Sequence, residues 1–282
     1  METSVQLAAE IERNVTAALA EDIGSGDLTA QLMPAGHPAR GIVVSREAAV
    51  LCGSAWFDAC FHRLDTRARI RWHARDGDRI DAGQTLCEIE ADTRALLTAE
   101  RPALNFLQLL SGTASVTRSY VDAITGTRAQ IVDTRKTLPG LRLAQKYAVK
   151  TGGGTNHRHG LYDGILIKEN HIIAAGGIRQ ALDQAHAIAH GKVFIQIEVE
   201  SLVELEEALE CGVTMVLLDN MTLDQMRDAV AINAGRAELE AFGGVNLECV
   251  RIIAETGVNR ISIGSLTKDV RALDLSLRHV ER

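Results

Sequence analysis

Short aliphatic segments alternate with amphipathic helical segments across the second half of the chain, and this alternation limits the fold more than any other feature. The predicted strands are Ala129–Val132, Gly164–Ile167, Val193–Val199, Thr214–Leu218, Glu238–Phe242 and Arg260–Ile263. The helical segments include Ile178–Ala189, Leu202–Leu209 and Leu223–Ile232. Strands that alternate with helices lie parallel in one sheet. Because the strands are short and evenly spaced, and no GxGxxG motif follows any of them, a closed or nearly closed β/α barrel is favoured over an open dinucleotide-binding sheet.

The first hundred residues follow a different pattern, typical of a small α+β domain. Apolar spacing predicts a helix over Val5–Leu19, and strands are predicted over Gly41–Cys52, Ala68–Trp72 and Thr85–Ile89. A bridging helix, with Pro102 in its first turn, continues to Val121, and Arg271–Leu277 is predicted as a short terminal helix. We therefore expect an α/β protein: an N-terminal α+β sandwich domain over residues 1–110, with the tail 270–282 packed back on it, and an incomplete β/α barrel of six to seven strands over 111–269.

Composition excludes several classes of protein. The chain of 282 residues has a formal net charge of −7, which argues against a nucleic-acid coat or a membrane-surface binder. No apolar run approaches the roughly 18 residues of a membrane span, and the N-terminal stretch has no signal-type core. The five cysteines are odd in number and form no CxxC pair, which suits reduced thiols and predicts a cytoplasmic protein.

Polar and glycine residues end the predicted barrel strands. They are Asp133–Lys136, Lys168–Asn170, Glu198, Asp219–Asn220, Gly243–Gly244 and Gly264–Ser265. A β/α barrel carries its chemistry on the loops that follow the carboxyl ends of its strands. One such residue alone is more often a solvated strand end, but the whole series at one rim predicts an active site.

Basic residues are concentrated in one segment of this acidic protein. Between Thr134 and Lys168, seven basic residues stand against the single acid Asp163: Arg135, Lys136, Arg142, Lys146, Lys150, Arg158 and Lys168. Such a patch, with aromatic residues at only 4%, predicts a small, multiply anionic ligand rather than a nucleic acid. Part of the block, Lys146 or Lys150, fits equally well as the exposed face of a helix.

The glycine-rich loop Gly152–Gly160 is a second candidate for anion binding. It is not a Walker loop, because no Gly-Lys-Ser/Thr follows at the required spacing. Its glycines allow the backbone to approach an anion, and His157 and Arg158 add donors. His157 and His159 are weak evidence for zinc without further soft ligands. Glu198 and Asp219 suit Mg²⁺ or sugar hydroxyls, although they could also merely neutralise Lys168.

Several motifs together resemble the quinolinate phosphoribosyltransferase family, the carboxylating nicotinate-nucleotide pyrophosphorylases. They are Asp133–Gly140, Gly152–Arg158, Tyr162–His171, Glu198–Glu200 and Leu217–Met221, with Glu21–Asp27 near the N-terminus and Ala272–Leu277 near the end. The resemblance extends over nearly the whole chain. It implies transfer of a phosphoribosyl group from phosphoribosyl pyrophosphate to quinolinate with decarboxylation, giving nicotinate mononucleotide, pyrophosphate and CO₂ in de novo NAD synthesis, with Mg²⁺.

The resemblance also implies roles for individual residues. The quinolinate carboxylates are expected on Arg135, Lys136, His157 and Arg158, with Lys168 between quinolinate and the phosphoribosyl group. Glu198 and Asp219 are expected to face the ribose hydroxyls and the metal, and the expected catalytic set is Lys136, Lys168, Glu198 and Asp219. The 5′-phosphate is expected in a cradle of Gly243, Gly244, Gly264 and Ser265, with Lys268 as an added charge. Arg101 is expected to reach the site of the neighbouring subunit in a homodimer, and a hexamer of such dimers stays open.

Phe242 departs from the family pattern, because a serine commonly stands at that place before the glycines. One hydroxyl donor to the 5′-phosphate is therefore missing.

The expected reaction needs no side-chain nucleophile or general base, since positioning and electrostatics suffice for attack by the pyridine nitrogen.

Three other functions are compatible with parts of the sequence. A barrel lyase could form a Schiff base on Lys168, although the surrounding cations exceed what one imine needs. A repurposed paralogue from the molybdenum-transport branch of the superfamily is the second, and the intact Asn156–Arg158 and Ile167–His171 runs argue against it. Asp76–Leu86 resembles half of a lipoyl or biotinyl module, but no lysine precedes Lys136 to carry the group.

Overall fold

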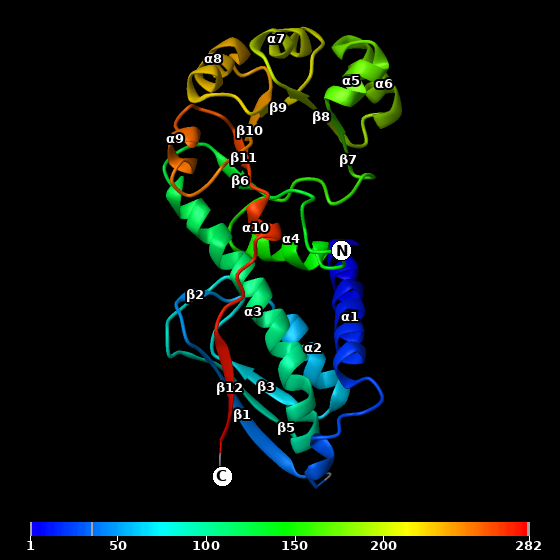
Figure 1. The fold of residues 1–282 in the computed structure, drawn as a ribbon, viewed down its shortest axis with the longest axis vertical. Coiled ribbons are helices and arrows are strands. Elements are labelled where there is room, and N and C mark those ends of the chain that lie inside the picture. The colour runs from blue at the N-terminus through cyan, green and yellow to red at the C-terminus, as the bar shows by residue number, and fades with distance from the viewer. Residues whose placement is uncertain (1, 35, 281–282) are drawn as a thin grey trace. The chain divides into compact units, whose positions relative to one another are not determined.

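The structure is a computed structural model that describes residues 2–34 and 36–280, and it divides into two compact units. The first unit contains residues 1–118, 137–153 and 266–282, and the second contains 119–136 and 154–265. Figure 1 shows the course of the chain through both. No helix among the described residues is long and apolar enough to span a bilayer.

The first unit is a sandwich of helices on an antiparallel sheet. Its four-stranded sheet has the order β12-β1-β5-β3, made by β12 (Leu275–His279), β1 (Pro38–Ser45), β5 (Thr85–Asp92) and β3 (Arg69–Trp72). A short pair joins β2 (Ala49–Val50) to β4 (Arg79–Ile80). The helices of this unit are α1 (Glu2–Ile23), the 3-10 turn η1 (Ala30–Leu32), α2 (Ser54–Leu64), α4 (Arg142–Thr151) and most of α3 (Thr93–Ala123).

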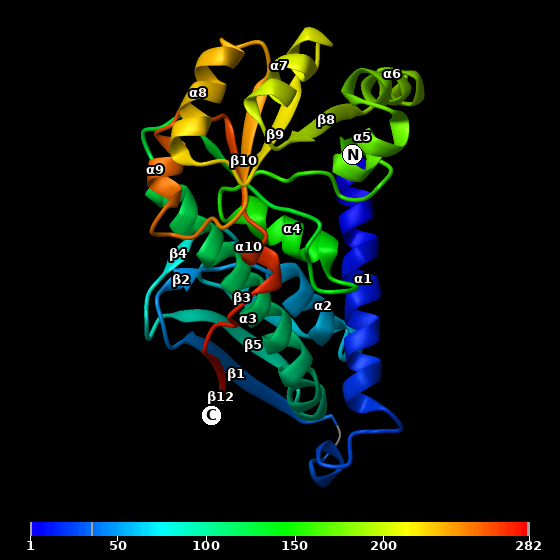
Figure 2. The ribbon, with the colours of Figure 1, turned by 45° about the horizontal axis from the view of Figure 1, so that its top comes forward.

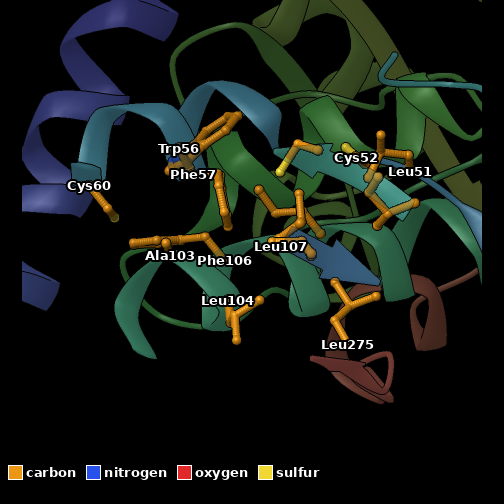
Figure 3. Close-up of a cluster of buried hydrophobic side chains, with 14 of the residues drawn as sticks. Leu51, Cys52, Trp56, Phe57, Cys60, Ala103, Leu104, Phe106, Leu107 and Leu275 are labelled. Carbon is orange, nitrogen blue, oxygen red and sulfur yellow. The ribbon is translucent and has the colours of Figure 1, made fainter. Parts of the chain in front are cut away.

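One hydrophobic core fills the first unit between its sheet and its helices. Trp56 and Phe57 of α2 and Leu104 and Leu107 of α3 are almost completely buried, and Leu275 of β12 packs into the same cluster (Figure 3). Trp56 also donates a hydrogen bond from Nε1 to the side chain of Asn14 in α1, which gives its polar atom a buried partner. Figure 2 shows α1, α2 and α3 on one side of this sheet.

The second unit is an incomplete barrel of parallel strands. Its strands are β6 (Gln130–Val132), β7 (Gly164–Ile167), β8 (Phe194–Val199), β9 (Met215–Asp219), β10 (Glu238–Phe242) and β11 (Arg260–Ser262). The order β6-β11-β10-β9-β8-β7 pairs the last strand with the first, whereas no ladder joins β6 to β7 within the described chain. Beyond β6, a single parallel bridge from Val132 to Thr155 begins a further strand position.

Helices cover the outer face of this curved sheet, as in a β/α barrel (Figure 1). They are α5 (Glu169–Ala175), α6 (Ile178–Ala189), α7 (Leu202–Glu210), α8 (Leu223–Asn233) and α9 (Val250–Ala254); α10 (Ser265–Lys268) follows β11. Hydroxyls of Ser201 and Thr222 accept hydrogen bonds from the backbone in the first turns of α7 and α8. The predicted β/α barrel with an N-terminal α+β domain is therefore confirmed.

Two details differ from the sequence predictions. Arg271–Leu277 is not a helix: the chain is extended there, and β12 pairs with β1 because Leu273 and Leu275 alternate into the core. Pro102 does not open a helix but lies inside α3, which begins at Thr93. The chain passes from the first compact unit to the second inside α3, which continues unbroken to Ala123, and residues 137–153, with α4, belong to the first unit.

Candidate active site

A cavity of about 320 Å³ lies at the carboxyl ends of the barrel strands, wholly within the second unit. Its lining residues are Asp133, Thr134, Arg135, Lys136, His157, Arg158, Leu166, Lys168, Glu198, Leu217, Phe242 and Ser262. Six predicted site residues are thus brought together: Arg135, Lys136, His157, Arg158, Lys168 and Glu198. The cavity offers four cationic side chains to a ligand small enough to fit it.

Asp133 joins the end of β6 to the loop that follows Gly154. Its buried carboxylate accepts a hydrogen bond from Nδ2 of Asn156 at 2.6 Å and another from the backbone N–H of His157 at 2.8 Å. The backbone N–H of Lys136 donates to the hydroxyl of Thr134 at 3.0 Å. These bonds fix the backbone that carries Arg135 and Lys136, so Asp133 supports the site rather than offering its charge to a ligand.

The positive charge of Arg158 is influenced by that of Arg135. Its Nη1 donates to the carbonyl of Gly164 at 2.9 Å. Burial, and then the nearby guanidinium of Arg135, lower the pKa of Arg158. Two guanidinium groups that repel one another favour an anionic ligand, because such a ligand relieves their repulsion and takes bidentate hydrogen bonds from each.

Both ring nitrogens of His157 are engaged within the chain. Nδ1 accepts a hydrogen bond from the backbone N–H of Arg158 at 2.8 Å, and Nε2 lies 2.7 Å from Oε1 of Gln196. The ring also meets that of Phe194 edge to face, with centroids 5.5 Å apart. His157 therefore lines the cavity with both of its ring nitrogens bonded within the chain.

His159 belongs to a turn that Asp163 closes. The Asp163 carboxylate accepts from the backbone N–H groups of His159 and Gly160 at 2.7 and 2.8 Å, and these bonds contribute to lowering its pKa. Nδ1 of His159 lies 3.3 Å from the same carboxylate. Among the described residues, no three His, Cys, Asp or Glu side chains form a cluster suited to a metal ion. The His-x-His pair thus serves the loop's conformation in this structure.

Lys168 and Glu198 form an ion pair across the ends of β7 and β8. Nζ of Lys168 lies 2.8 Å from Oε2 of Glu198, whose side chain is only 10% exposed. The backbone N–H of Lys168 donates to Nδ1 of His171 at 3.0 Å, which holds the start of α5. Glu198 therefore neutralises Lys168 directly.

Asp219 ends β9 beside this pair. Its Oδ1 is buried and has no hydrogen-bond partner among the described residues. Burial, and then the charge of Glu198, raise the pKa of Asp219. An orphaned carboxylate oxygen beside a second carboxylate fits Mg²⁺, which uses one or two carboxylates and fills its remaining positions with water and phosphate oxygens.

Glycine backbone follows β10 at the predicted phosphate cradle. Gly243 has φ +106° and Gly244 has φ +60°, conformations that favour glycine. Nζ of Lys136 lies 5.0 Å from the centroid of the Phe242 ring, within cation–π range. Gly264 lies against the Lys136 side chain, where an added Cβ would come within 3.1 Å of Cδ. The glycine thus leaves room for the lysine stem.

Other predicted site residues do not line the cavity. In the second unit these are Asp219, Gly243, Gly244, Gly264 and Ser265. Arg101 and Lys268 belong to the first unit: Arg101 is exposed on α3, and Nζ of Lys268 lies 3.4 Å from the Asp269 carboxylate.

Sequence reasoning missed a buried polar network beneath the cavity, formed by Gln196, Glu240 and Ser262. A signal for it exists. Successive side chains of a strand alternate between two faces, so Gln196 shares a face with Glu198 and Glu240 shares one with Phe242. Gln196 and Glu240 each lie two positions before a residue that lines the cavity, Glu198 or Phe242, and so mark the inside of the barrel.

Comparison with known proteins gives a consistent result. Residues 27–111 match the family described as quinolinate phosphoribosyl transferase, N-terminal domain, and residues 113–278 match its C-terminal domain. A probable nicotinate-nucleotide pyrophosphorylase [carboxylating] of Bacillus subtilis is 40% identical over 257 residues, covering 91% of this chain and 89% of the relative. The Mycobacterium leprae nicotinate-nucleotide pyrophosphorylase [carboxylating] is 44% identical over 270 residues, covering 92% and 94%.

A solved structure agrees with these relatives. The nicotinate-nucleotide pyrophosphorylase of Francisella tularensis superposes with a TM-score of 0.94 at 42% identity, covering 96% of each chain. This similarity extends through both units of the fold.

Proposed function

This chain belongs to the quinolinate phosphoribosyltransferase family, and on that premise we propose how its residues bind quinolinate and phosphoribosyl pyrophosphate and join them. The chain is a decarboxylating phosphoribosyltransferase of NAD biosynthesis, whose products are nicotinate mononucleotide, pyrophosphate and CO₂.

The convergence of cations in one cavity is the observation that carries the assignment of roles. Arg135, Lys136, Arg158 and Lys168 all line the cavity of about 320 Å³. Quinolinate is a dicarboxylate, and phosphoribosyl pyrophosphate is a polyphosphate. Guanidinium groups bind carboxylates with paired hydrogen bonds, so Arg135 and Arg158 hold quinolinate. Lys136 adds a further positive charge for the quinolinate carboxylates, and Lys168 lies between quinolinate and the phosphoribosyl group as a point charge.

These roles are enough for the chemistry. The lone pair of the pyridine nitrogen forms the bond to the anomeric carbon, while the bond from that carbon to pyrophosphate breaks and its electron pair leaves on the pyrophosphate oxygen. The carboxylate beside the now cationic nitrogen is then lost as CO₂, and the ring carbon takes a proton from solvent. Positive side chains lower the barrier by meeting the charge that develops on pyrophosphate, and the cavity holds the reactants in line.

Glu198 and Asp219 hold Mg²⁺ and the ribose hydroxyls in this proposal. The support is the orphaned Oδ1 of Asp219, next to a carboxylate close enough to raise its pKa. When bound with phosphoribosyl pyrophosphate, Mg²⁺ neutralises phosphate charge. Release of Glu198 from Lys168 would free that lysine for the substrate.

The remaining assignments rest on the family and the local backbone. Gly243, Gly244, Gly264 and Ser265 cradle the 5′-phosphate with backbone N–H groups, and Lys268 adds charge. Arg101 completes the site of a second copy in a homodimer. Five free cysteines, three of them buried, support a reducing cytoplasmic location.

The test is turnover by the purified protein with quinolinate, phosphoribosyl pyrophosphate and Mg²⁺, following nicotinate mononucleotide and CO₂, with nicotinate as a parallel substrate. Product from quinolinate and none from nicotinate supports the proposal. Equal turnover of nicotinate overturns the carboxylate assignments, and a folded protein inactive with both acids overturns the function.

A barrel lyase is disfavoured by the ion pair of Lys168. Its Nζ donates to Glu198, and an ammonium in such a pair has no lone pair with which to attack a carbonyl. Borohydride trapping with a carbonyl substrate checks this, and covalent labelling of Lys168 would support the lyase instead.

A further inference from the structure

A chain of buried hydrogen bonds runs beneath the cavity from β10 to the loop that carries Arg158. The Glu240 carboxylate, 1% exposed, accepts from Nε of Arg260 at 3.0 Å, from the hydroxyl of Ser262, and from Nε2 of Gln196 at 3.2 Å. Gln196 is fully buried, and its Oε1 lies 2.7 Å from Nε2 of His157. The established reaction uses none of Gln196, Glu240 or Ser262 directly.

The positions of the protons in this series of hydrogen bonds can be assigned from the end at Arg158. The backbone N–H of Arg158 can only donate, so Nδ1 of His157 must accept and carries no proton. A neutral imidazole then has its proton on Nε2, and this proton points at Gln196. Gln196 must therefore present its oxygen to His157 and its amide N–H to Glu240. A flipped amide would place two donors face to face.

Glu240 supplies the acceptor that makes this orientation the stable one. An ionised carboxylate only accepts hydrogen bonds, so it matches the amide N–H of Gln196 and would repel the amide oxygen. Burying a carboxylate is costly, and the donors from Arg260, Ser262 and Gln196 offset that cost. The same carboxylate lies 3.7 Å from Nε2 of His157.

We infer that Glu240, acting through Gln196, is a positioning residue that holds His157 as its neutral Nε2–H tautomer and so fixes the backbone from which Arg158 reaches the ligand. The inference deepens the proposed function, because it assigns to this network the geometry of the quinolinate end of the site. In this inference His157 positions the backbone of Arg158, whereas Arg135 and Arg158 contact the ligand.

Two variants test this, with a matched control. Gln196→Met removes the acceptor for His157 at nearly constant volume, and Glu240→Gln keeps hydrogen-bonding capacity but no longer dictates the orientation of Gln196. Thr256→Val is the control: it removes another buried hydrogen bond of the second unit, from its hydroxyl to the carbonyl of Ile253. Thermal unfolding of each variant establishes that it folds.

The kinetic result expected for Gln196→Met is a rise of about tenfold in KM for quinolinate, the equivalent of one hydrogen bond of about 1.4 kcal/mol, with KM for phosphoribosyl pyrophosphate and kcat nearly unchanged. Glu240→Gln shifts the same constant by a smaller factor. In a His157→Asn background, Gln196→Met should have no further effect. Equal changes in both KM values, or full additivity with His157→Asn, would overturn the inference.

A spectroscopic measurement is independent of turnover. Long-range ¹H–¹⁵N spectra of protein labelled at histidine, with the His157 signals assigned by their loss in His157→Asn, should show one protonated nitrogen, Nε2, in the wild type. In Gln196→Met the Nε2–H group loses its acceptor, so the ring should turn away from the backbone N–H of Arg158 and this pattern should give way to a mixture of forms. An Nδ1–H or doubly protonated ring in the wild type would overturn the inference. If the wild type does not use quinolinate, the proposed function fails while these spectra still decide the tautomer.

Discussion

Nζ of Lys168 donates a hydrogen bond to Oε2 of Glu198 over 2.8 Å, joining the ends of β7 and β8 by a charged pair inside the cavity. The two partners are expected to separate when substrate arrives, because each has a better partner there: phosphate or carboxylate oxygens for Lys168, and Mg²⁺ or hydroxyls for Glu198. In the absence of substrate, the pair thus gives each of the two charges a partner of opposite charge.

Replacing Lys168 by Met should lower kcat/KM for both substrates by about 100-fold or more, the usual effect of removing one group that meets transition-state charge. The loss should be larger in kcat than in either KM, because the charge on the leaving group grows in the transition state. Steady-state kinetics with each substrate varied in turn checks this. Glu255→Gln is the control, since it breaks the exposed pair of Glu255 with Arg251, and it should leave both constants unchanged.

Replacing Arg135 by Ala should raise KM for quinolinate by more than about tenfold, because a charge-assisted bond to a carboxylate contributes about 1.5–3 kcal/mol. Since Arg135 lowers the pKa of Arg158, its loss also removes a repulsion that the ligand would have relieved. Kinetics at fixed, saturating phosphoribosyl pyrophosphate measures the change. Arg179→Ala, at an exposed position on α6, is the matched control. Unchanged turnover and quinolinate KM in Arg135→Ala would remove this residue from the site.

Much of this site follows from sequence because barrel topology brings strand ends to one rim. Arg135, Lys168 and Glu198 are far apart in the chain, yet each follows or closes a strand, and the structure places all three around one cavity. The strand limits of Gly164–Ile167 and Glu238–Phe242 were also predicted to the residue. Strand–helix alternation and the polar residues at strand ends are local patterns of the sequence, so they can be recognised without knowledge of long-range contacts.

The features that sequence reasoning missed depend on long-range contacts. The segment Arg271–Leu277 was predicted as a helix, but its last residues belong to β12, whose pairing with β1 sets the conformation. The role of His157 depends on a hydrogen bond to Gln196, 39 residues away in the chain. Its motif identified His157 as important, but only the geometry shows that both of its nitrogens are already engaged.

The ring face of Phe242 should stabilise the ammonium group of Lys136. A cation–π contact contributes about 0.5–2 kcal/mol, so Phe242→Leu, which keeps the bulk and loses the ring, should lower kcat/KM by about threefold to tenfold. Phe242→Tyr keeps the ring and should retain activity. Phe242→Ser loses the ring and adds a hydroxyl toward the proposed 5′-phosphate site, so its KM for phosphoribosyl pyrophosphate should fall relative to Phe242→Leu. Equal kinetics for the leucine and tyrosine variants would show that the ring face is not used.

Gly243 should tolerate no side chain. It has φ +106°, and an added Cβ would collide with Oδ1 of Asn220, which itself has φ +52°. Gly243→Ala should therefore raise KM for phosphoribosyl pyrophosphate by about tenfold or more, through displacement of the cradle. Gly212→Ala is the control, because Gly212 also has positive φ, at +76°, but open space around it. It should cost about 1 kcal/mol of stability without changing that KM. If both variants shift the KM alike, backbone strain alone is responsible.

Asp58 on α2 should make stability depend on pH. Burial raises its pKa from 3.8, while the hydrogen bond from Nε1 of Trp72, 2.9 Å long, opposes the shift. A raised folded-state pKa means that the ionised carboxylate costs free energy of folding above that pKa, and that the cost disappears as pH falls below the unfolded value. Asp58→Asn keeps an acceptor for Trp72 and removes the charge. Its melting temperature should therefore exceed that of the wild type at pH 7, and the difference should shrink steadily as pH falls toward 3.8. Asp183→Asn, at an exposed position of α6, should show neither effect. A difference for Asp58→Asn that stays constant across this range would mean that packing, rather than ionisation, is responsible.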